Sequence, residues 1–190
     1  MKKIAGIILV ILGIMFFAHA IWWSPFNFFV PHATNIKNQI AIDDGDLIEM
    51  NITSENVTIL PTDAEKVSVQ VTGRDLNNIN FTMNRENHKL QIDLSPKWYS
   101  FSNTNELKLL VYVPRKQDVR FNIDATSRVV QIGMNQGEKW NIDQLNTEIV
   151  DGTVYLKNVI VNDLVYDGTS TDVIVDRFES KQALIDTFSG

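Results

Sequence analysis

The 190-residue chain contains no cysteine, which excludes disulfide bonds, thiolate nucleophiles, cysteine-bound zinc and anchoring through a lipidated N-terminal cysteine. Histidine is scarce as well. His19, His32 and His88 have no spacing typical of a zinc site and lie in no motif of a catalytic serine. The sequence also lacks a glycine-rich phosphate loop and a dinucleotide-binding fingerprint. We therefore predict that the protein is not an enzyme and has no catalytic residue, no metal site and no cofactor.

Basic residues are few. The chain has 17 Lys and Arg against 23 Asp and Glu, a net charge of −6, and Lys2 and Lys3 are the only cations among the first 23 residues. The remainder therefore carries −8. An acidic domain repels nucleic acid and other anionic polymers unless a local basic patch outweighs its field, and no dense run of basic residues is visible. The charge predicts that nucleic acid is not a partner.

The N-terminus contains a long uncharged run. From Ile4 to Trp23 there are twenty residues without a formal charge, and a helix of that length rises about 30 Å, the thickness of a hydrocarbon core. Lys2 and Lys3 precede the run, and Trp22 and Trp23 close it. This arrangement predicts a single membrane-spanning helix in contact with lipid, with the N-terminus in the cytoplasm and the rest of the chain outside.

We accordingly predict that residues 1–23 are an uncleaved membrane anchor. The alternative is a signal peptide cleaved after Ala18-His19-Ala20, but the apolar run continues beyond that site. Residues 24–46 read as a juxtamembrane linker. Its end, Asp43-Asp44-Gly45-Asp46, suggests a calcium loop, yet it lacks the spacing and the distal Glu of an EF-hand, so we interpret it as a solvated turn.

Residues 47–190 show the period-two alternation of half-buried β-strands. Turn-forming residues such as Pro61-Thr62-Asp63 and Asn84 to Asn87 separate the alternating segments. No segment in this part has a helical apolar stripe. The alternating apolar positions are Val57 and Ile59, then Val67, Val69 and Val71, then Leu90, Ile92 and Leu94, and finally Leu107, Leu109, Val111 and Val113.

The second half of the chain repeats a turn and a strand. Val154–Val159 aligns with Val173–Phe178, and each copy follows an Asp-Gly-Thr, which begins at Asp151-Gly152 and at Asp167-Gly168. A period near twenty with short strands is typical of a β-solenoid, in which each coil buries its apolar face against the next. The sequence therefore predicts an all-β, solenoid-like stack of short strands, and a β-sandwich is the alternative.

Two further features concern the repeats. Leu145, Leu164 and Leu184 recur at intervals of 19 and 20 residues, which suggests that they occupy equivalent places in successive repeats. The sequence stops at Gly190, where the earlier copies continue into an apolar strand. Because an unpaired final coil exposes apolar surface and free hydrogen-bonding groups, we expect that the native chain is longer.

The order of these segments resembles a known family. A lysine-initiated membrane segment, then SENVTILPTDAEKVSVQVTG, then ELKLLVYVPRKQDVRFNIDATS, then Gly-punctuated repeats ending in IDTFSG are similar to the LiaG-like candidate adhesins, a bacterial family of unknown function. The chain departs from the family pattern at Asp-Gly-Thr and at Ala125–Arg128. The resemblance implies a membrane-anchored, extracytoplasmic protein of the cell envelope, in some members encoded beside envelope-stress regulators, and it supplies no catalytic residues.

Two functions follow from the sequence. The first is a noncatalytic, adhesin-type surface that binds an envelope protein or a cell-wall partner. The alternative is a glycan-active enzyme, since paired carboxylates suffice for glycoside hydrolysis and Asp151, Asp167 and Asp186 occupy similar places in the repeats. An Asp beside a Gly is also a common turn residue, so we prefer the first function.

Overall fold

The computed structural model describes residues 35–73, 76–97 and 107–188. The predicted membrane anchor, with Lys2, Lys3, Ile4, Trp22 and Trp23, lies outside these residues, as does Gly190. Within the three described ranges, no helix is long and apolar enough to span a membrane.

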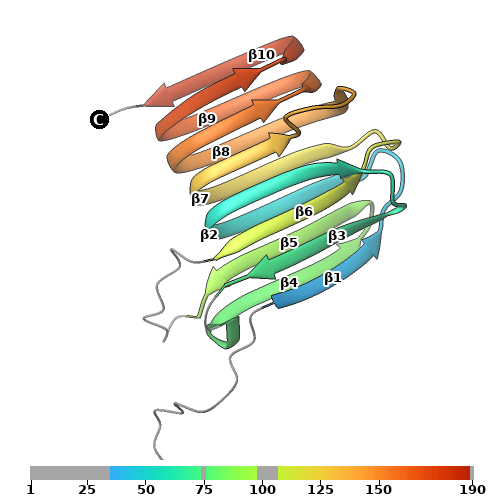
Figure 1. Ribbon diagram of the computed structural model, residues 1–190, viewed down its shortest axis with the longest axis vertical. Helices are drawn as coiled ribbons and strands as arrows, with labels where there is room; N and C mark the ends of the chain where they lie inside the picture. Colours follow the sequence, from blue (N-terminus) through green and yellow to red (C-terminus); the bar gives the residue numbers. More distant parts are fainter. Residues whose placement is uncertain (1–34, 74–75, 98–106, 189–190) are drawn as a thin grey trace, which may run out of the picture. The chain divides into compact units, whose positions relative to one another are not determined.

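The described residues form one ten-stranded sheet, and its only helical turn is the 3-10 segment Leu76–Asn78. The main path through the sheet runs β1-β3-β6-β2-β7-β8-β9-β10, while β5 pairs with both β2 and β4 (Figure 1). The all-β prediction is therefore confirmed. The strands are β1 (Asn35–Ala41), β2 (Leu47–Thr62), β3 (Lys66–Thr72), β4 (Ile79–Glu86), β5 (Lys89–Pro96), β6 (Lys108–Pro114), β7 (Arg120–Gly133), β8 (Trp140–Lys157), β9 (Val159–Asp176) and β10 (Glu179–Phe188).

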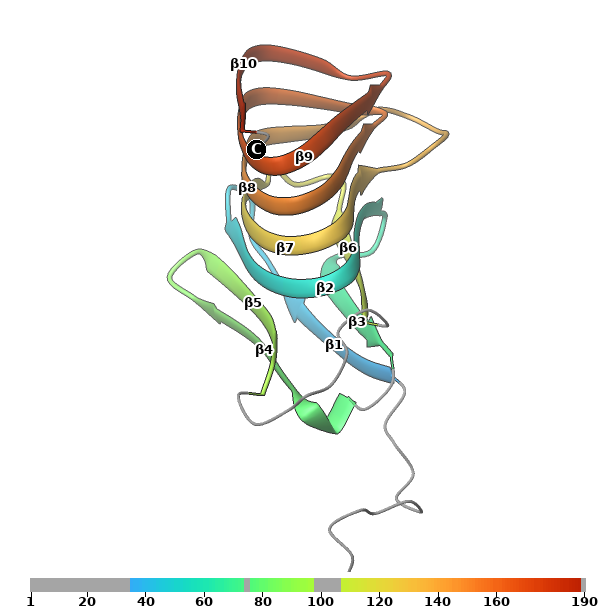
Figure 2. The ribbon, with the colours of Figure 1, turned by 90° about the vertical axis from the view of Figure 1, so that its left-hand side faces the viewer.

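Strands β2, β7, β8 and β9 are long, and each curves over its neighbour in a stack (Figure 2). They pair in parallel, and so does β10 with β9. Val154 of β8 pairs with Val173 of β9, so the predicted repeat spacing is the step between these two coils. The sheet is solenoid-like as predicted, but one strand of 14 to 18 residues replaces the short strands we expected in each of these four coils.

Each of these strands has two halves that meet at a bend. The first half of β2 pairs with β5 and its second half pairs with β6, while β7 pairs with both halves. The residues at the bend include Asp151 and Ser170, which have positive φ angles of 62° and 55°. Because a chain at positive φ turns sharply, these residues allow one continuous strand to form both sides of a coil.

The core lies inside the bend. Alternate residues of every coil point inward and stack on the equivalent residues of the next coil, and burial of such apolar rows is the main stabilising contribution. The predicted inward positions from Val57 to Val113 are all buried, with exposures of 0–2%. Trp140 and Phe121 add an edge-to-face contact with ring centroids 5.7 Å apart.

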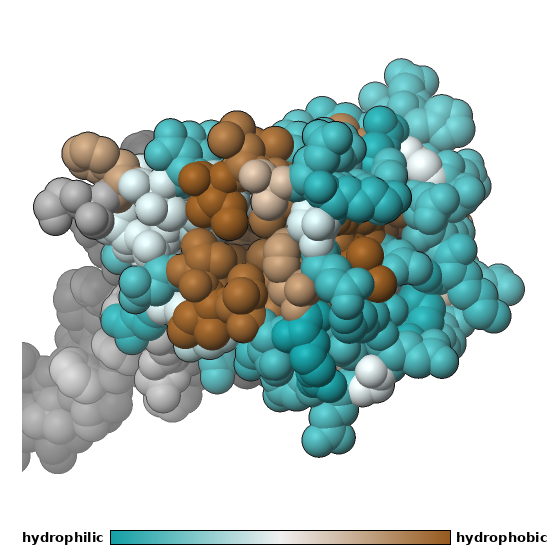
Figure 3. Space-filling view, turned by 90° about the horizontal axis from the view of Figure 1, so that it is seen from above, coloured by the Kyte–Doolittle hydropathy of each residue, from teal (hydrophilic) through white to brown (hydrophobic). Residues whose placement is uncertain are grey.

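Strand β10 and the second half of β9, which β10 does not cover, leave apolar side chains on the surface. Ile185 and Val175 are 51% and 54% exposed, and Leu184 is 65% exposed. Figure 3 looks down onto this end, where hydrophobic surface is visible. Leu184 pairs with Val165 and not with Leu164, so its predicted equivalence to Leu145 and Leu164 is wrong by one residue, which turns a side chain to the opposite face.

The opposite end of the stack, beyond β2, carries antiparallel strands (Figure 1). β3 pairs antiparallel with β6, and β1 pairs antiparallel with β3. β1 lies within residues 24–46, for which we expected only a linker, so that interpretation is wrong for residues 35–41. The sequence did not reveal this strand because only two of its apolar residues, Ile36 and Ile40, are partly buried. β1 covers the margin of the core, so it needs little apolar surface.

Candidate functional site

The two halves of the coils present different chemistry to solvent. The outward residues of the first halves form an acidic face, which includes Asp124, Glu148, Asp167 and Asp186. The outward residues of β1, β3 and β6, together with the second halves of the coils, form a second face that we call the lysine face. Its lysines are Lys37, Lys66, Lys108 and Lys157, which come from four different strands, and its carboxylates include Glu65 beside β3 and the exposed Asp172 and Asp176 of β9.

The acidic face contains a carboxylate ladder, one residue on each of four successive strands. Asp124 pairs with Glu148, Glu148 with Asp167, and Asp167 with Asp186. Neighbouring strands are about 4.8 Å apart, and like charges at that distance repel each other. None of the four carboxylates forms an ion pair or a hydrogen bond within the described residues, so the ladder faces solvent without a neutralising partner in those ranges.

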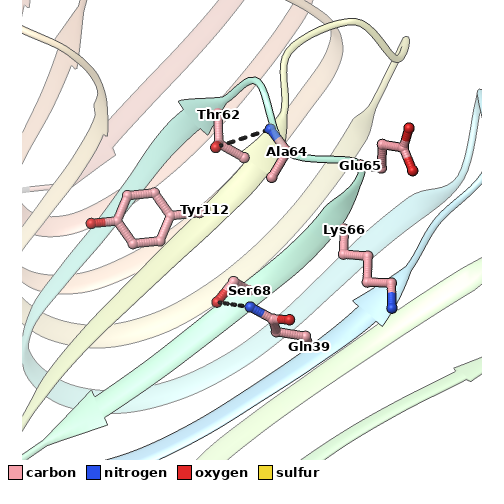
Figure 4. Close-up of a pocket in the computed structure, with 7 residues that line it drawn as sticks. All are labelled: Gln39, Thr62, Ala64, Glu65, Lys66, Ser68 and Tyr112. Carbon is pink, nitrogen blue, oxygen red and sulfur yellow. Dashed lines mark hydrogen bonds between the residues drawn. The ribbon is translucent and has the colours of Figure 1, made fainter.

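The lysine face contains a hollow of about 540 Å³ (Figure 4). Strand pairing brings the residues of its floor side by side. Gln39 of β1 pairs with Ser68 of β3, and Ser68 pairs with Tyr112 of β6. The Gln39 amide donates to the Ser68 hydroxyl at 3.5 Å, a long hydrogen bond between two neighbouring strands. The turn between β2 and β3 supplies the rim, formed by Thr62, Ala64, Glu65 and Lys66.

A second hollow of about 360 Å³ lies further along the same face. Tyr112 lines the first hollow and Lys108 lines the second, and both side chains project outward from β6. Four residues of an extended strand span roughly 13 Å. The two hollows therefore lie in line along β6, and the second is lined by Asn56, Thr58, Gln70, Thr72, Lys108, Leu109 and Leu110.

The lysines of this face have no acidic partners within the described residues. Lys37, Lys66 and Lys108 are exposed, and in the same ranges none of them forms an ion pair or a hydrogen bond. Lys157 differs, because its ammonium group lies 4.8 Å from the centre of the Tyr155 ring. Three ammonium groups are thus free to bind an anion beside the two hollows.

The Asp43–Asp46 turn holds another group of titratable residues. Burial alone would raise the pKa of Asp46, but hydrogen bonds from Arg85 and His88 and from the Asp43 amide outweigh burial and lower that pKa. Arg85 Nε lies 2.7 Å from Asp46 Oδ2, and His88 Nδ1 lies 3.0 Å from Oδ1. The hydrogen bond to Asp46 is the main reason that the pKa of Arg85 is raised.

Asp43, Asp46 and His88 have ligand atoms close enough together to hold a metal ion. Arg85, however, binds both carboxylates, and a guanidinium in this position takes the place of a cation. The turn also joins the next coil, since the Asp118 amide donates to Asp44 Oδ1 at 2.7 Å. The turn is therefore built as a structural junction, although Asp46 is fully buried and not solvated as we expected.

The structure places the predicted repeat-turn residues in two different settings. Asp151 and Gly152 lie at the bend of β8, where the φ angle of Gly152 is +134°. Asp167 and Gly168 lie inside β9 before its bend at Ser170, and Gly152 pairs with Thr171. The prediction that Asp167 and Gly168 form the equivalent turn is wrong, because the residue of β8 that pairs with Asp167 is Glu148 and not Asp151.

Gly168 has a packing role. A Cβ at this position would lie 2.2 Å from Thr171 Oγ1 and 2.6 Å from Tyr166 Cε1, so the glycine makes room for the hydrogen bond from the Tyr166 hydroxyl to Thr171. Burial is the main cause that raises the pKa of Tyr166, and that hydrogen bond opposes it. Of the three aspartates considered as acid residues, Asp167 and Asp186 are adjacent, while Asp151 lies apart at the bend.

Sequence reasoning missed the lysine face. Alternation does predict that Lys108, Leu110 and Tyr112 point away from the core, since Leu109 and Val111 point inward. It does not predict that β3 and β1 lie beside β6, because those pairings join segments that are distant in the sequence. The four lysines are therefore dispersed in sequence and gathered only by the fold.

Comparisons with known proteins give one family and several similar folds. The family model described as Toastrack DUF4097 matches residues 45–190. No curated protein matches the chain. Among solved structures, the chain is similar to a candidate cell adhesion protein from Clostridium sporogenes, with 8% identity, a TM-score of 0.43 and coverage of 82% of this chain and 100% of that one.

Two further structures are similar. One is a candidate lipid binding protein from Parabacteroides distasonis, with 13% identity, a TM-score of 0.49 and coverage of 82% of this chain and 63% of that one. The other is a candidate adhesin from Bacteroides fragilis, with 13% identity, a TM-score of 0.34 and coverage of 84% of this chain and 95% of that one. At such identities and TM-scores the structures carry no functional argument, and only the family match supports an assignment.

Proposed function

The chain belongs to the Toastrack DUF4097 family, and on that premise we propose that it is a noncatalytic binding module of the bacterial cell envelope. The observation that carries the proposal is the lysine face, where hydroxyl, amide, aromatic and ammonium groups surround two open hollows. These groups project from paired strands, so the backbone positions that carry them are set before a ligand arrives. A preorganised backbone favours binding because less conformational entropy is lost.

The arrangement of the acidic residues supports a noncatalytic role. General acid and base groups in enzymes have pKa values tuned by burial and by their neighbours. Asp167 and Asp186 are exposed on the ladder, and Asp46, which is buried, is occupied by Arg85 and His88. The glycan-active enzyme remains the competing hypothesis because Asp167 and Asp186 are neighbours.

We further propose that residues 1–23 anchor the module in the cell membrane, with residues after Trp23 outside and the N-terminus in the cytoplasm. The length and lack of charge of the Ile4–Trp23 run support this. Within its family the chain is, in our proposal, LiaG-like and linked to the envelope stress response. Protease treatment of intact cells tests the topology: the β domain should be degraded, and its survival would refute it.

Site-specific photo-crosslinking in cells tests the binding function. A photoreactive residue replaces Ser68 in the first hollow or Glu148 on the acidic face as a matched control. We expect a crosslinked envelope component at position 68 and little at position 148. Equal labelling at both positions, or none at either, would contradict a binding role for the lysine face.

An activity assay separates the two functions. The purified full-length chain, in nonionic detergent, is incubated with cell-wall and capsular glycans, and reducing ends are measured. The binding function predicts no release. Release that disappears in Asp167→Asn or Asp186→Asn would establish the enzyme instead.

A further inference from the structure

We propose that the lysine face binds an extended anionic polysaccharide, which lies along β6 across both hollows. This inference rests on the proposed binding function and names the class of ligand. Three observations support it: the polar groups of the two hollows, the three free ammonium groups, and the distance of these groups from the carboxylate ladder.

The polar groups of the hollows suit a polyhydroxylated ligand. Hydroxyl and amide groups from Ser68, Thr62 and Gln39 in the first hollow can each both donate and accept hydrogen bonds, as sugar hydroxyls do. Tyr112 adds an aromatic ring with a polar tip. Asn56, Thr58, Gln70 and Thr72 repeat the same chemistry in the second hollow.

The free lysines favour an anionic ligand. Lys66 lines the first hollow, Lys108 lines the second, and Lys37 pairs in register with Gln70 between them. None of the three ammonium groups has a partner within the described residues, so a ligand carboxylate or phosphate would meet no competitor in those ranges except Glu65 on the rim. Ammonium groups form charge-assisted hydrogen bonds that are stronger than neutral ones.

The net charge of the chain does not prevent this binding. The ladder carboxylates project from the first halves of the coils. The hollows lie over β6, which pairs with the second half of β2, and over β3, which pairs with β6. Packed sheet surfaces lie about 10 Å apart, and the ladder carboxylates and the lysines point away from each other. These charges are therefore further apart than the Debye length, which is about 8 Å at physiological salt. Repulsion from the acidic face is therefore screened at the lysine face.

An elongated polymer fits better than a small ligand. The hollows are open and adjoin along β6. Ser68 pairs with Tyr112, so Lys66 lies about six residues, roughly 20 Å, from the level of Lys108, a distance that one compact molecule does not span with both lysines engaged. A polymer with a repeated acidic group can meet Lys66 and Lys108 at once. Two contacts on one chain also raise the effective concentration at the second hollow.

Three probes test the proposal with the full-length chain in nonionic detergent. They are oligogalacturonate, with one carboxylate on each sugar, its neutral methyl ester, and oligoglutamate of equal charge, each followed by isothermal titration calorimetry. We expect oligogalacturonate to bind, and both the methyl ester and oligoglutamate to bind at least roughly tenfold more weakly. Raising the salt concentration should weaken binding.

Variants locate the site. Lys66→Gln and Lys108→Gln should each weaken oligogalacturonate binding by roughly tenfold, the loss of one charge-assisted hydrogen bond. Lys181→Gln on β10 removes the same charge elsewhere and should change affinity by less than about twofold. Circular dichroism of each variant checks that its fold is intact.

Every other outcome overturns the inference. Binding of oligoglutamate as tight as that of oligogalacturonate would identify an acidic peptide as the ligand class. No binding of any probe, or an equal effect of Lys181→Gln and Lys66→Gln, would refute the polysaccharide. If crosslinking at position 68 still captures an envelope component in these cases, the proposed function stands while this inference fails.

Discussion

Replacing Gly152 by alanine should separate adjacent coils at the bend of β8. An added Cβ would lie 2.2 Å from the carbonyl oxygen of Ser127 and 2.6 Å from that of Arg128, both on the backbone of the preceding coil. The residue also has a φ of +134°, a conformation that residues other than glycine rarely adopt. Backbone strain of about 1–3 kcal/mol and a steric overlap of about 1–3 kcal/mol add to a destabilisation of about 2–6 kcal/mol.

Gly45→Ala is the matched control. Gly45 also has a positive φ, +75°, but nothing lies within 4 Å of its added Cβ. Only the backbone strain applies, so we expect a loss of about 1–2 kcal/mol. The difference between the two variants contains the contact between coils together with the greater backbone strain at a φ of +134°.

Urea unfolding of the full-length chain in nonionic detergent measures both variants. Because stacked coils unfold in local units, hydrogen exchange of the β7 and β8 amides should also locate the damage in Gly152→Ala at the bend. We infer that the close approach of two backbones at this glycine holds the coils together. Equal destabilisation of the two variants would refute this, and so would a loss of hydrogen-exchange protection at amides far from the bend.

Three other perturbations have predictable outcomes. Arg85→Met leaves the buried carboxylate of Asp46 without its guanidinium and should lower the free energy of unfolding by about 2–4 kcal/mol in urea titrations at neutral pH. Asp43→Asn removes an exposed carboxylate and should change that free energy by less than about 1 kcal/mol. Similar values for the two variants would contradict the role of burial. Asp93 of β5 resembles Asp46, because burial would raise its pKa but hydrogen bonds from Asn51, Gln91 and Thr82 lower it. The stabilisation from both carboxylates is therefore complete above the ordinary carboxyl pKa of about 4 and is lost as the pH falls through the folded-state values. Circular dichroism should record unfolding on the acid side, with a shallower pH dependence in the Asp93→Asn variant, and stability that rises on acidification through this range would oppose this reasoning. Glu148→Gln relieves repulsion in the carboxylate ladder and should raise the midpoint of thermal unfolding. The gain should be equivalent to about 0.2–1 kcal/mol at low salt and smaller at about 0.5 M NaCl. A gain independent of salt would argue against repulsion as the cause.

Local alternation was sufficient to predict the core. Val67, Val69 and Val71 are fully buried, and Val154 and Val173 pair as the repeat alignment predicted. In a stacked sheet each residue's direction depends only on its parity in the strand, and parity can be read from neighbouring residues. The pattern of the sequence therefore carries enough information to orient most side chains.

Features that depend on distant pairing could not be predicted in the same way. β1 carries too little apolar surface to be distinguished from a linker, and the position of Asp167 in its coil depends on where the strand bends. The bend is set by residues of unlike type, Asp151 in β8 and Ser170 in β9, which share only a positive φ. The candidate site was inaccessible for the same reason, because Tyr112, Ser68 and Gln39 become neighbours only through strand order.

The register that pairs Val154 of β8 with Val173 of β9 has an evolutionary consequence. A tandem duplication of the segment between two such paired positions would insert a whole coil, because the added residues restore the same parity and the same bend. The insertion would lengthen the domain by one strand spacing, about 4.8 Å, while the coils on either side keep their own internal pairing. Genes of this type can thus change the reach of their product in uniform increments by recombination, with no need to redesign the interior.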